Sequence, residues 1–110
     1  MRRTFLLAVL IFTGILLLST EVAAADKATQ DLYLAKCKAC HGPDGMATAA
    51  GKKLGASDFN SPETLKLTEA AMLEVTTKGK EKMPAYGPKL KAEEIKSLVA
   101  YVRELGKAKK

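Results

Sequence analysis

The sequence predicts an all-α fold, and two observations support this prediction. Apolar residues recur at intervals of three and four positions in residues 68–78 and 92–105, which is the spacing of a helix that buries one face. No segment after residue 25 alternates strictly between apolar and polar residues, as a half-buried strand does. We therefore expect helices and no sheet in a folded domain that spans residues 26–110.

Residues 1–25 have the pattern of a secretory signal peptide. They begin with Arg2 and Arg3, continue with an apolar stretch over residues 5–18, and end in alanines at residues 23–25. We expect cleavage after this segment and export of the remaining chain. If the segment stayed attached, it would be long enough to anchor the protein in a membrane.

The first helix is expected over residues 27–39. Three of its apolar residues share one face at helical spacing: Ala28, Leu32 and Ala35. A glycine-rich loop over residues 42–55 follows. A short helical turn then begins at Ser61, with Pro62 at the first helical position, where proline is well tolerated.

The middle helix is expected over residues 68–78. Thr68 is a favourable N-cap, because its hydroxyl can accept a hydrogen bond from the first turn, and Gly79 is a typical helix stop. Met72 lies at helical spacing with its apolar neighbours. A methionine in such a position belongs more often to the core than to a metal site.

The last helix is expected over residues 92–105, with an apolar face that must pack against another element. That face consists of Ile95, Leu98, Val99, Val102 and Leu105. Lys91 stands where Ser or Thr usually caps a helix, so we expect Glu93 and Glu94 to favour the first turn through the helix dipole alone. The lysine-rich tail after Gly106 is expected to fray.

The net charge is +6, but the kind of basic residue favours a protein partner over nucleic acid. After residue 25, Arg103 is the single arginine and all other basic residues except His41 are lysines. Nucleic-acid-binding surfaces typically combine arginine with interleaved aromatic side chains, and aromatic residues are few here. A lysine-rich exported domain is better suited to acidic protein surfaces or anionic lipid. Lysines that only form a solvated surface are the alternative.

Both cysteines and the single histidine of the chain fall within residues 37–41, as Cys37, Cys40 and His41. The pattern C-x-x-C-H is typical of covalent haem attachment. Residues three and four apart share one face of a helix. The two thiols can therefore add to the vinyl groups on one edge of a porphyrin, while the imidazole reaches the iron.

Three other interpretations of this motif are weaker. A disulfide between Cys37 and Cys40 suits an exported protein, but it would close a very short loop and stabilise the chain little. A thioredoxin-like redox pair needs a βαβ setting, and no strand is predicted. A structural zinc site needs four ligands, and after His41 the chain has no further Cys or His.

A haem iron held by His41 needs a sixth ligand or an open site, and methionine supplies the candidates. Met46 lies too close to His41 along the chain to reach the opposite face. Met72 remains an alternative, although its position favours the core. Met83 follows the Gly79 helix stop, in a loop that Pro84 stiffens. A thioether on a restricted loop suits a low-spin iron, so we favour Met83.

These residues resemble the small bacterial class I c-type cytochromes, and the resemblance covers essentially all of the chain after residue 25. The matching segments are residues 37–45, 67–69 leading to Gly79, 83–86, and 95–105. The resemblance implies an all-α fold of three to four helices around one covalently bound haem c. It also implies that His41 is the proximal ligand and Met83 the distal ligand.

The resemblance further implies a periplasmic, one-electron carrier that cycles its iron between Fe(III) and Fe(II) and is not an enzyme. We expect a monomer that meets redox proteins through acidic docking surfaces on those partners. Lysines that should border the haem would form the complementary ring: Lys36, Lys38, Lys52, Lys53, Lys78, Lys80, Lys82, Lys89 and Lys91. A membrane association is expected only if the signal segment is uncleaved.

Two departures from the family pattern concern packing and the proximal ligand. Thr29 stands where the family often has glycine at the crossing of the first and last helices, four residues before Tyr33. The family commonly has a proline-containing loop whose carbonyl accepts the N–H of the proximal imidazole. Residues 46–59 contain no proline, so no acceptor for His41 can be named.

Two alternative functions belong to other classes. A haem-based ligand sensor or a peroxidase-like enzyme would require that Met83 does not bind the iron. A thiol-disulfide redox protein would require free, titratable thiols at Cys37 and Cys40, with no covalent haem.

Overall fold

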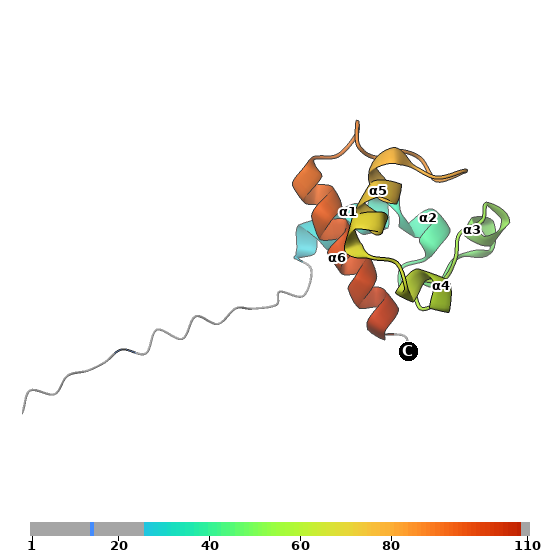
Figure 1. Cartoon of the computed structure of the whole chain (residues 1–110), viewed down its shortest axis with the longest axis horizontal. Coiled ribbons are helices and arrows are strands. Elements are labelled where there is room, and N and C mark those ends of the chain that lie inside the picture. Colours follow the sequence, from blue (N-terminus) through green and yellow to red (C-terminus); the bar gives the residue numbers. More distant parts are fainter. Residues whose placement is uncertain (1–13, 15–25, 109–110) are drawn as a thin grey trace, which may run out of the picture.

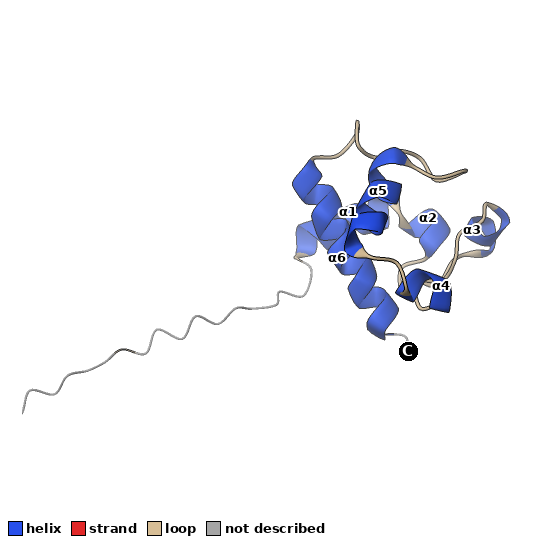
Figure 2. Cartoon of the chain, in the orientation of Figure 1, coloured by secondary structure: helices blue, strands red, loops and turns tan. Residues whose placement is uncertain are grey.

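The computed structural model describes Gly14 and residues 26–108, which form six helices and no strand. The helices are α1 (Lys27–Lys36), α2 (Lys38–His41), α3 (Ala49–Lys53), α4 (Pro62–Leu65), α5 (Glu69–Lys78) and α6 (Ala92–Ala108). Helix α6 crosses the domain and packs against α1 and α5 (Figures 1 and 2). The all-α prediction is confirmed. More helices occur than the expected three to four, because α2, α3 and α4 are short turns within the connections.

The predicted signal peptide, residues 1–25, lies outside the described residues apart from Gly14. Its cleavage therefore stays a prediction. In the part of the chain that the structure describes, no helix has the length and apolar character needed to cross a membrane.

Helix α1 begins at a capped end and buries a different face from the one predicted. The Asp26 carboxylate accepts a hydrogen bond from the Thr29 backbone N–H at 2.8 Å. Hydrogen bonding to the side chain and to the backbone of Thr29 lowers the pKa of Asp26. Thr29 and Tyr33 are the buried residues of α1, whereas Ala28 and Ala35 are exposed. Of the predicted stripe only Leu32 packs against the core. Tyr33 is the central residue of the buried face, because its ring offers far more apolar area than an alanine methyl group.

The first helical segment is interrupted where a single helix over residues 27–39 was expected. Helix α1 ends at Lys36, Cys37 is its C-cap, and α2 begins at Lys38. The backbone hydrogen bonds continue through the break, since the Cys37 N–H donates to the Tyr33 carbonyl at 2.8 Å and the His41 N–H donates to the Cys37 carbonyl at 3.0 Å. The break at Cys37 leaves Cys40 and His41 on a separate helical turn.

The loop expected over residues 42–55 contains helix α3, which the sequence analysis missed. Thr48 is its N-cap and accepts a hydrogen bond from the Gly51 N–H at 2.9 Å. The turn predicted at Ser61 is confirmed as α4, with Ser61 as N-cap and Pro62 in the first turn. Short capped helices of this kind depend on one side-chain hydrogen bond more than on apolar periodicity.

The last two helices begin and end at cap residues. Helix α5 is capped by Thr68, whose hydroxyl accepts from the Ala71 N–H at 3.1 Å, and it ends at Gly79, which has a φ of 78°. At the start of α6 the Lys91 N–H donates to the Glu94 carboxylate at 2.9 Å. The expectation that only the helix dipole supports this end was therefore wrong, because a side chain caps it. Helix α6 also continues beyond Gly106 to Ala108, where fraying was expected.

The core lies where α1 and α6 cross. Tyr33 is fully buried and meets Phe59 and Leu98, both also buried. The Tyr33 ring packs edge-on against Tyr101 of α6, with the ring centroids 5.2 Å apart. Ile95, Leu98 and Val99 are buried, and Val102 and Leu105 pack against the cluster, so the predicted apolar face of α6 is confirmed.

Gly106 lies where α6 packs closely against the loop that carries Phe59. A Cβ atom at this position would lie 2.6 Å from the Phe59 carbonyl oxygen. No rotamer change can relieve such a contact, because the neighbour is backbone. The glycine is therefore required by packing, although it lowers the helix propensity of α6.

We expect Gly106→Ala to destabilise the folded protein by about 1–3 kcal/mol, the usual cost of overpacking. Helix propensity alone would change stability in the opposite direction by about 1 kcal/mol. Denaturant unfolding of the haem-containing protein measures the change. Ser97→Ala, at an exposed position of the same helix, is the control and should change stability by no more than about 0.5 kcal/mol. A stabilised Gly106→Ala protein would contradict the packing argument.

Candidate haem site

Two adjoining cavities lie inside the ring of helices. The inner cavity has a volume of about 150 Å³ and the outer one about 400 Å³. Residues from several distant parts of the chain line both: Cys37, His41, Leu67, Val75, Met83 and Tyr86. The chain thus encloses a mainly apolar crevice within the size range of cofactor sites.

The structure brings the predicted site residues to this crevice. Cys37, His41 and Met83 line both cavities, and Cys40 lines the outer one. Met72 lines only the inner cavity. Met46 lines neither and is exposed, in agreement with the expectation that it is not a ligand.

The turn that carries His41 is held by hydrogen bonds to its backbone. The Tyr33 hydroxyl donates to the Gly42 carbonyl at 2.6 Å, and this bond is buried. On the other side, the Thr48 hydroxyl donates to the Ala39 carbonyl at 2.7 Å, and the Thr48 N–H donates to the Cys40 carbonyl at 3.0 Å. Helix α2 is therefore fixed by groups outside it.

Gly51 allows α3 to pack against this same turn. A Cβ atom at Gly51 would clash with the backbone of Cys40. The glycine-rich composition of the loop thus has a packing function beside the haem-binding motif. The glycines of this loop were evident from the sequence, but the helix that contains Gly51 was not.

The surroundings of His41 suit a neutral metal ligand. Burial lowers the pKa of His41 from its ordinary value, so the imidazole stays neutral at physiological pH. Its ring stacks on Phe59, with the centroids 4.8 Å apart and the planes inclined by 28°. The buried Nδ1 has no hydrogen-bond partner among the described residues.

The two cysteines are not joined by a disulfide. Burial raises the pKa of the Cys37 thiol to about 11. Nucleophilic cysteines of thiol-disulfide proteins instead have a lowered pKa. The described residues also contain no group of three or more His, Cys, Asp or Glu side chains that could hold a metal ion. The disulfide, thioredoxin-like and zinc interpretations therefore find no support here.

Met83 is presented by a tight hairpin. The Lys80 N–H donates to the Met83 carbonyl at 3.2 Å, and the Met83 N–H donates to the Lys80 carbonyl at 2.9 Å. Glu81, inside this turn, has a φ of 54°, a left-handed conformation that is uncommon for residues other than glycine. The reciprocal hydrogen bonds hold the backbone of Met83 in place.

Tyr86 joins the Met83 segment to two helices. Its hydroxyl donates to the Lys36 carbonyl at the end of α1, at 3.0 Å, and its N–H donates to the Thr76 carbonyl of α5, at 3.0 Å. Burial raises the pKa of this phenol. One residue thus ties the loop of Met83 to the helix that precedes Cys37.

Phe59, Tyr86 and Thr48 were not assigned a role in the site from the sequence. Phe59 is the one aromatic residue between Tyr33 and Tyr86, which indicates a core position but not a neighbour of His41. The contacts of Tyr86 and Thr48 connect residues 50 and 9 positions apart, and no local pattern reports them.

Comparisons with known proteins identify the family of this chain. Residues 24–102 match the family model described as "Cytochrome C oxidase, cbb3-type, subunit III". Two cytochromes c6 are similar over most of both chains: the one from Nostoc sp. is 35% identical, covering 94% of this chain and 88% of the relative, and the one from Rippkaea orientalis is 30% identical, covering 86% and 83%. This chain belongs to the c-type cytochromes.

Further matches place this cytochrome among small class I members. The solved structure of the KustC0563 c-type cytochrome has a TM-score of 0.66 and 39% identity, covering 70% of this chain and 95% of that one. The Cbb3-type cytochrome c oxidase subunit CcoP of Azospirillum brasilense is 35% identical over 94 residues. The chain spans about a third of the length of CcoP, since the match covers 32% of that protein.

The cytochrome carries one covalently bound haem c and is an electron-transfer protein rather than an enzyme. The residues present fit this group, because two thiols, a half-buried neutral imidazole and a thioether meet in an apolar crevice. When bound, haem c supplies a one-electron Fe(III)/Fe(II) couple. The apolar lining excludes water, and the hydrogen bonds at Gly42 and Cys40 keep α2 in place. As a carrier, the cytochrome exchanges electrons with redox proteins.

We expect Tyr33→Phe to lower the free energy of unfolding by about 1–3 kcal/mol, because it leaves the buried Gly42 carbonyl without its donor. Burial raises the pKa of Tyr33 above its ordinary value of 10.0. The unfolded phenol therefore ionises first, and the stability of the parent protein falls as the pH rises above that value. The phenylalanine variant lacks this dependence, so the stability difference should narrow above about pH 10.

Urea unfolding of the haem-containing protein at several pH values measures both effects. Tyr101→Phe is the matched control: no hydrogen bond of the Tyr101 hydroxyl is found among the described residues, and its ring contacts Tyr33. It should lower stability less than Tyr33→Phe. If both variants lowered the free energy of unfolding equally, the result would contradict the role given to the hydrogen bond from Tyr33 to the Gly42 carbonyl.

Proposed function

We propose that this cytochrome is a periplasmic one-electron carrier in which Cys37 and Cys40 hold the haem as thioethers and His41 and Met83 are the axial ligands. The observation that carries the proposal is that His41 and Met83 line both parts of one crevice, beside Cys37. Residues that are more than 40 positions apart in the sequence thereby meet at one site.

Met83 is favoured over Met72 by its position and by its backbone. Met83 borders the outer as well as the inner cavity, whereas Met72 is confined to the inner one. The Met83 backbone is held by two hydrogen bonds to Lys80. A ligand on a fixed loop is already positioned for the iron, and this lowers the entropic cost of binding.

Two filled axial positions leave no place for a substrate or for dioxygen, so the chain can hold and release electrons without other chemistry. A neutral thioether donates weakly to ferric iron, and an apolar crevice disfavours the extra positive charge of that state. Both effects favour the reduced form. We expect a positive reduction potential.

Periplasmic location follows from the predicted signal peptide in residues 1–25. Cleavage would release a monomeric carrier, and an uncleaved segment would anchor the same domain to the membrane. Haem attachment outside the cytoplasm is consistent with export of an unfolded chain.

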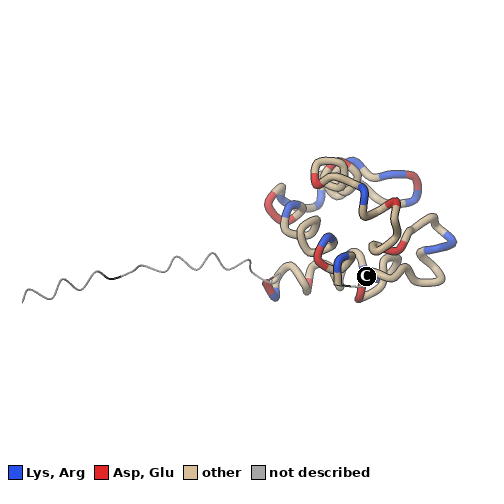
Figure 3. The backbone as a smooth tube through the Cα atoms, turned by 60° about the horizontal axis from the view of Figure 1, so that its bottom comes forward, with Lys and Arg blue, Asp and Glu red and all other residues tan. Residues whose placement is uncertain are grey.

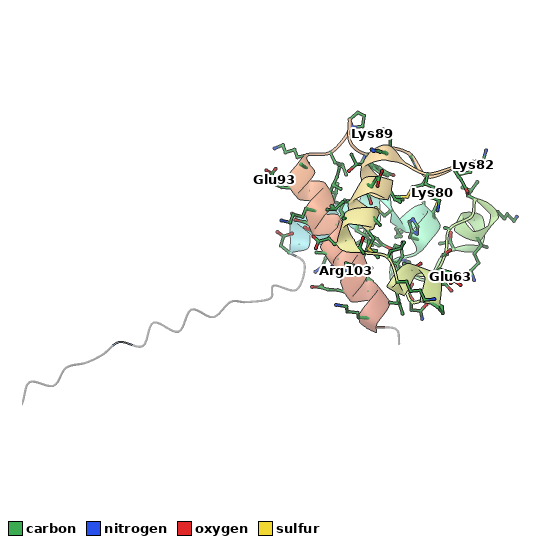
Figure 4. The ribbon with its side chains drawn as sticks, viewed as in Figure 1. Glu63, Lys80, Lys82, Lys89, Glu93 and Arg103 are labelled. Atoms are coloured by element: carbon green, nitrogen blue, oxygen red, sulfur yellow. The ribbon has the colours of Figure 1, made fainter. Side chains whose placement is uncertain are left out.

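The docking face that we propose surrounds the outer cavity. Charged residues of both signs are spread along the chain (Figure 3), so the net charge alone does not define a face. Lys36, Lys80 and Lys82 line the outer cavity and are exposed. Figure 4 shows Lys80 and Lys82 projecting from the loop after α5, on the side away from Glu93. Such a face suits an acidic redox partner and a weak, short-lived complex.

The axial-ligand assignment is tested by the weak near-infrared band of methionine-ligated ferric haem. We expect Met83→Ala to lose this band and Met72→Ala to keep it, after maturation with covalent haem. Carbon monoxide should bind readily to the reduced Met83→Ala protein and poorly to the parent. The reverse spectral pattern would assign the ligand to Met72. Ready carbon monoxide binding to the parent protein would favour a ligand sensor or a peroxidase-like enzyme.

The docking face is tested by the rate of electron transfer to an acidic redox protein at several ionic strengths. We expect the rate of the parent protein to fall as salt increases, and Lys82→Glu to slow the reaction roughly tenfold at low salt. Lys96→Glu makes the same change of charge at an exposed position of α6 that does not line the outer cavity, so it is the control and should have a smaller effect. A rate that does not depend on salt would contradict electrostatic steering.

A further inference from the structure

The proximal imidazole lacks the contact that usually orients such a ring. A histidine that binds a metal through one nitrogen normally donates the other N–H to an oxygen acceptor, and this bond fixes the plane of the ring. The His41 Nδ1 is buried and has no hydrogen-bond partner among the described residues. Another contact must therefore determine the orientation of the imidazole.

Phe59 provides that contact. Its ring lies over the His41 ring, with a centroid distance of 4.8 Å and an angle of 28° between the planes. The two rings are stacked, and stacking is favourable between aromatic side chains. Phe59 is only 8% exposed and also lines the inner cavity. The stacked ring covers one face of the imidazole and limits its rotation.

Phe59 is itself held from three sides. Its N–H donates to the Gly45 carbonyl at 2.9 Å. A Cβ atom at Gly45 would lie 2.8 Å from the Phe59 ring, and one at Gly106 would lie 2.6 Å from the Phe59 carbonyl. The Tyr33 ring meets the Phe59 ring edge-on, with a centroid distance of 6.4 Å. The position of Phe59 is therefore set by α1, by α6 and by the loop after His41.

We propose that Phe59 is a positioning residue that sets the plane of the His41 imidazole in place of a hydrogen bond to Nδ1. The inference rests on the proposed role of His41 as the proximal ligand and assigns the residue that orients it. It also connects the ligand to α6, because Gly106 determines how closely Phe59 approaches.

The arrangement has an electronic consequence. An imidazole that donates its second N–H to an acceptor becomes a stronger ligand and stabilises ferric iron, whereas one without an acceptor favours ferrous iron. Nδ1 is buried, and a side chain smaller than Phe59 would leave room beside the imidazole for a water molecule to become that acceptor. Removing the aromatic ring should therefore lower the reduction potential and change the orientation of the imidazole.

The test compares Phe59→Leu, which keeps an apolar side chain but removes the flat ring, with Phe59→Tyr, which keeps the ring. Ile95→Val is the control for core stability, because Ile95 is 3% exposed and does not line either cavity. Each haem-containing protein is measured by redox titration and by the NMR shifts of the haem methyl groups in the ferric state, which report the plane of the axial imidazole.

We expect Phe59→Leu to have a lower potential and an altered pattern of methyl shifts, and Phe59→Tyr and Ile95→Val to retain the parent pattern. An unchanged methyl pattern in Phe59→Leu would overturn the proposal. An equal change of the methyl pattern in Ile95→Val would also overturn it, because that result would show that less tight packing of the core is enough to cause the change.

NMR of the reduced parent protein tests the contact without any substitution. Protons of an imidazole bound to haem iron are shifted strongly by the ring current of the porphyrin. Such shifted His41 protons with nuclear Overhauser effects to the Phe59 ring support the proposal, even if Phe59→Leu does not fold. Shifted His41 protons without those effects would overturn the positioning role alone, and unshifted His41 protons would overturn His41 as the ligand.

Discussion

The hydrogen bond from the Tyr33 hydroxyl to the Gly42 carbonyl connects the helical core to the segment that we propose binds the haem. Tyr33 is fully buried where α1 and α6 cross, and its bond of 2.6 Å ends on the residue after His41. Because a buried carbonyl needs a donor, the position of α2 depends on the packing of these helices. The same ring contacts Phe59, which lies against the imidazole. Tyr33 thus supports His41 both through the hydrogen bond to Gly42 and through the ring of Phe59.

The size of the domain explains why the haem site and the core are almost the same region. A chain of this length buries only roughly 60–65% of the surface of its unfolded state. Among the described residues, the buried hydrophobic side chains are Tyr33, Phe59, Ile95, Leu98 and Val99, and all except Ile95 also line the inner cavity. Small domains of this kind usually need an additional source of stability, such as a disulfide or a bound metal. Covalent haem held in this crevice would supply apolar volume that the polypeptide lacks.

Local signals in the sequence predicted the parts of the fold that depend on neighbouring residues. Thr68 and Gly79 delimit α5, and Ser61 with Pro62 begins α4, because caps act within one helical turn. The spacing of Cys37, Cys40 and His41 indicated haem, because the chemistry requires these groups on one turn. The same reasoning failed at α1, because the buried face is set by the packing of Tyr33 against Leu98 and Tyr101 of α6. It also failed at Lys91, where the capping group is the carboxylate of Glu94 rather than the side chain of the cap residue.

By itself, the sequence determined the helical class, the haem-binding motif and a short set of candidate methionines, since residue spacing and cap chemistry are properties of short segments. Only the tertiary structure decided that His41 lies against Phe59, that Tyr86 ties the Met83 loop to α1, and that Gly106 sets the approach of α6. These contacts join residues 18, 50 and 47 positions apart. Their partners are chosen by how whole helices pack, and packing depends on shape and volume that a one-dimensional pattern does not contain.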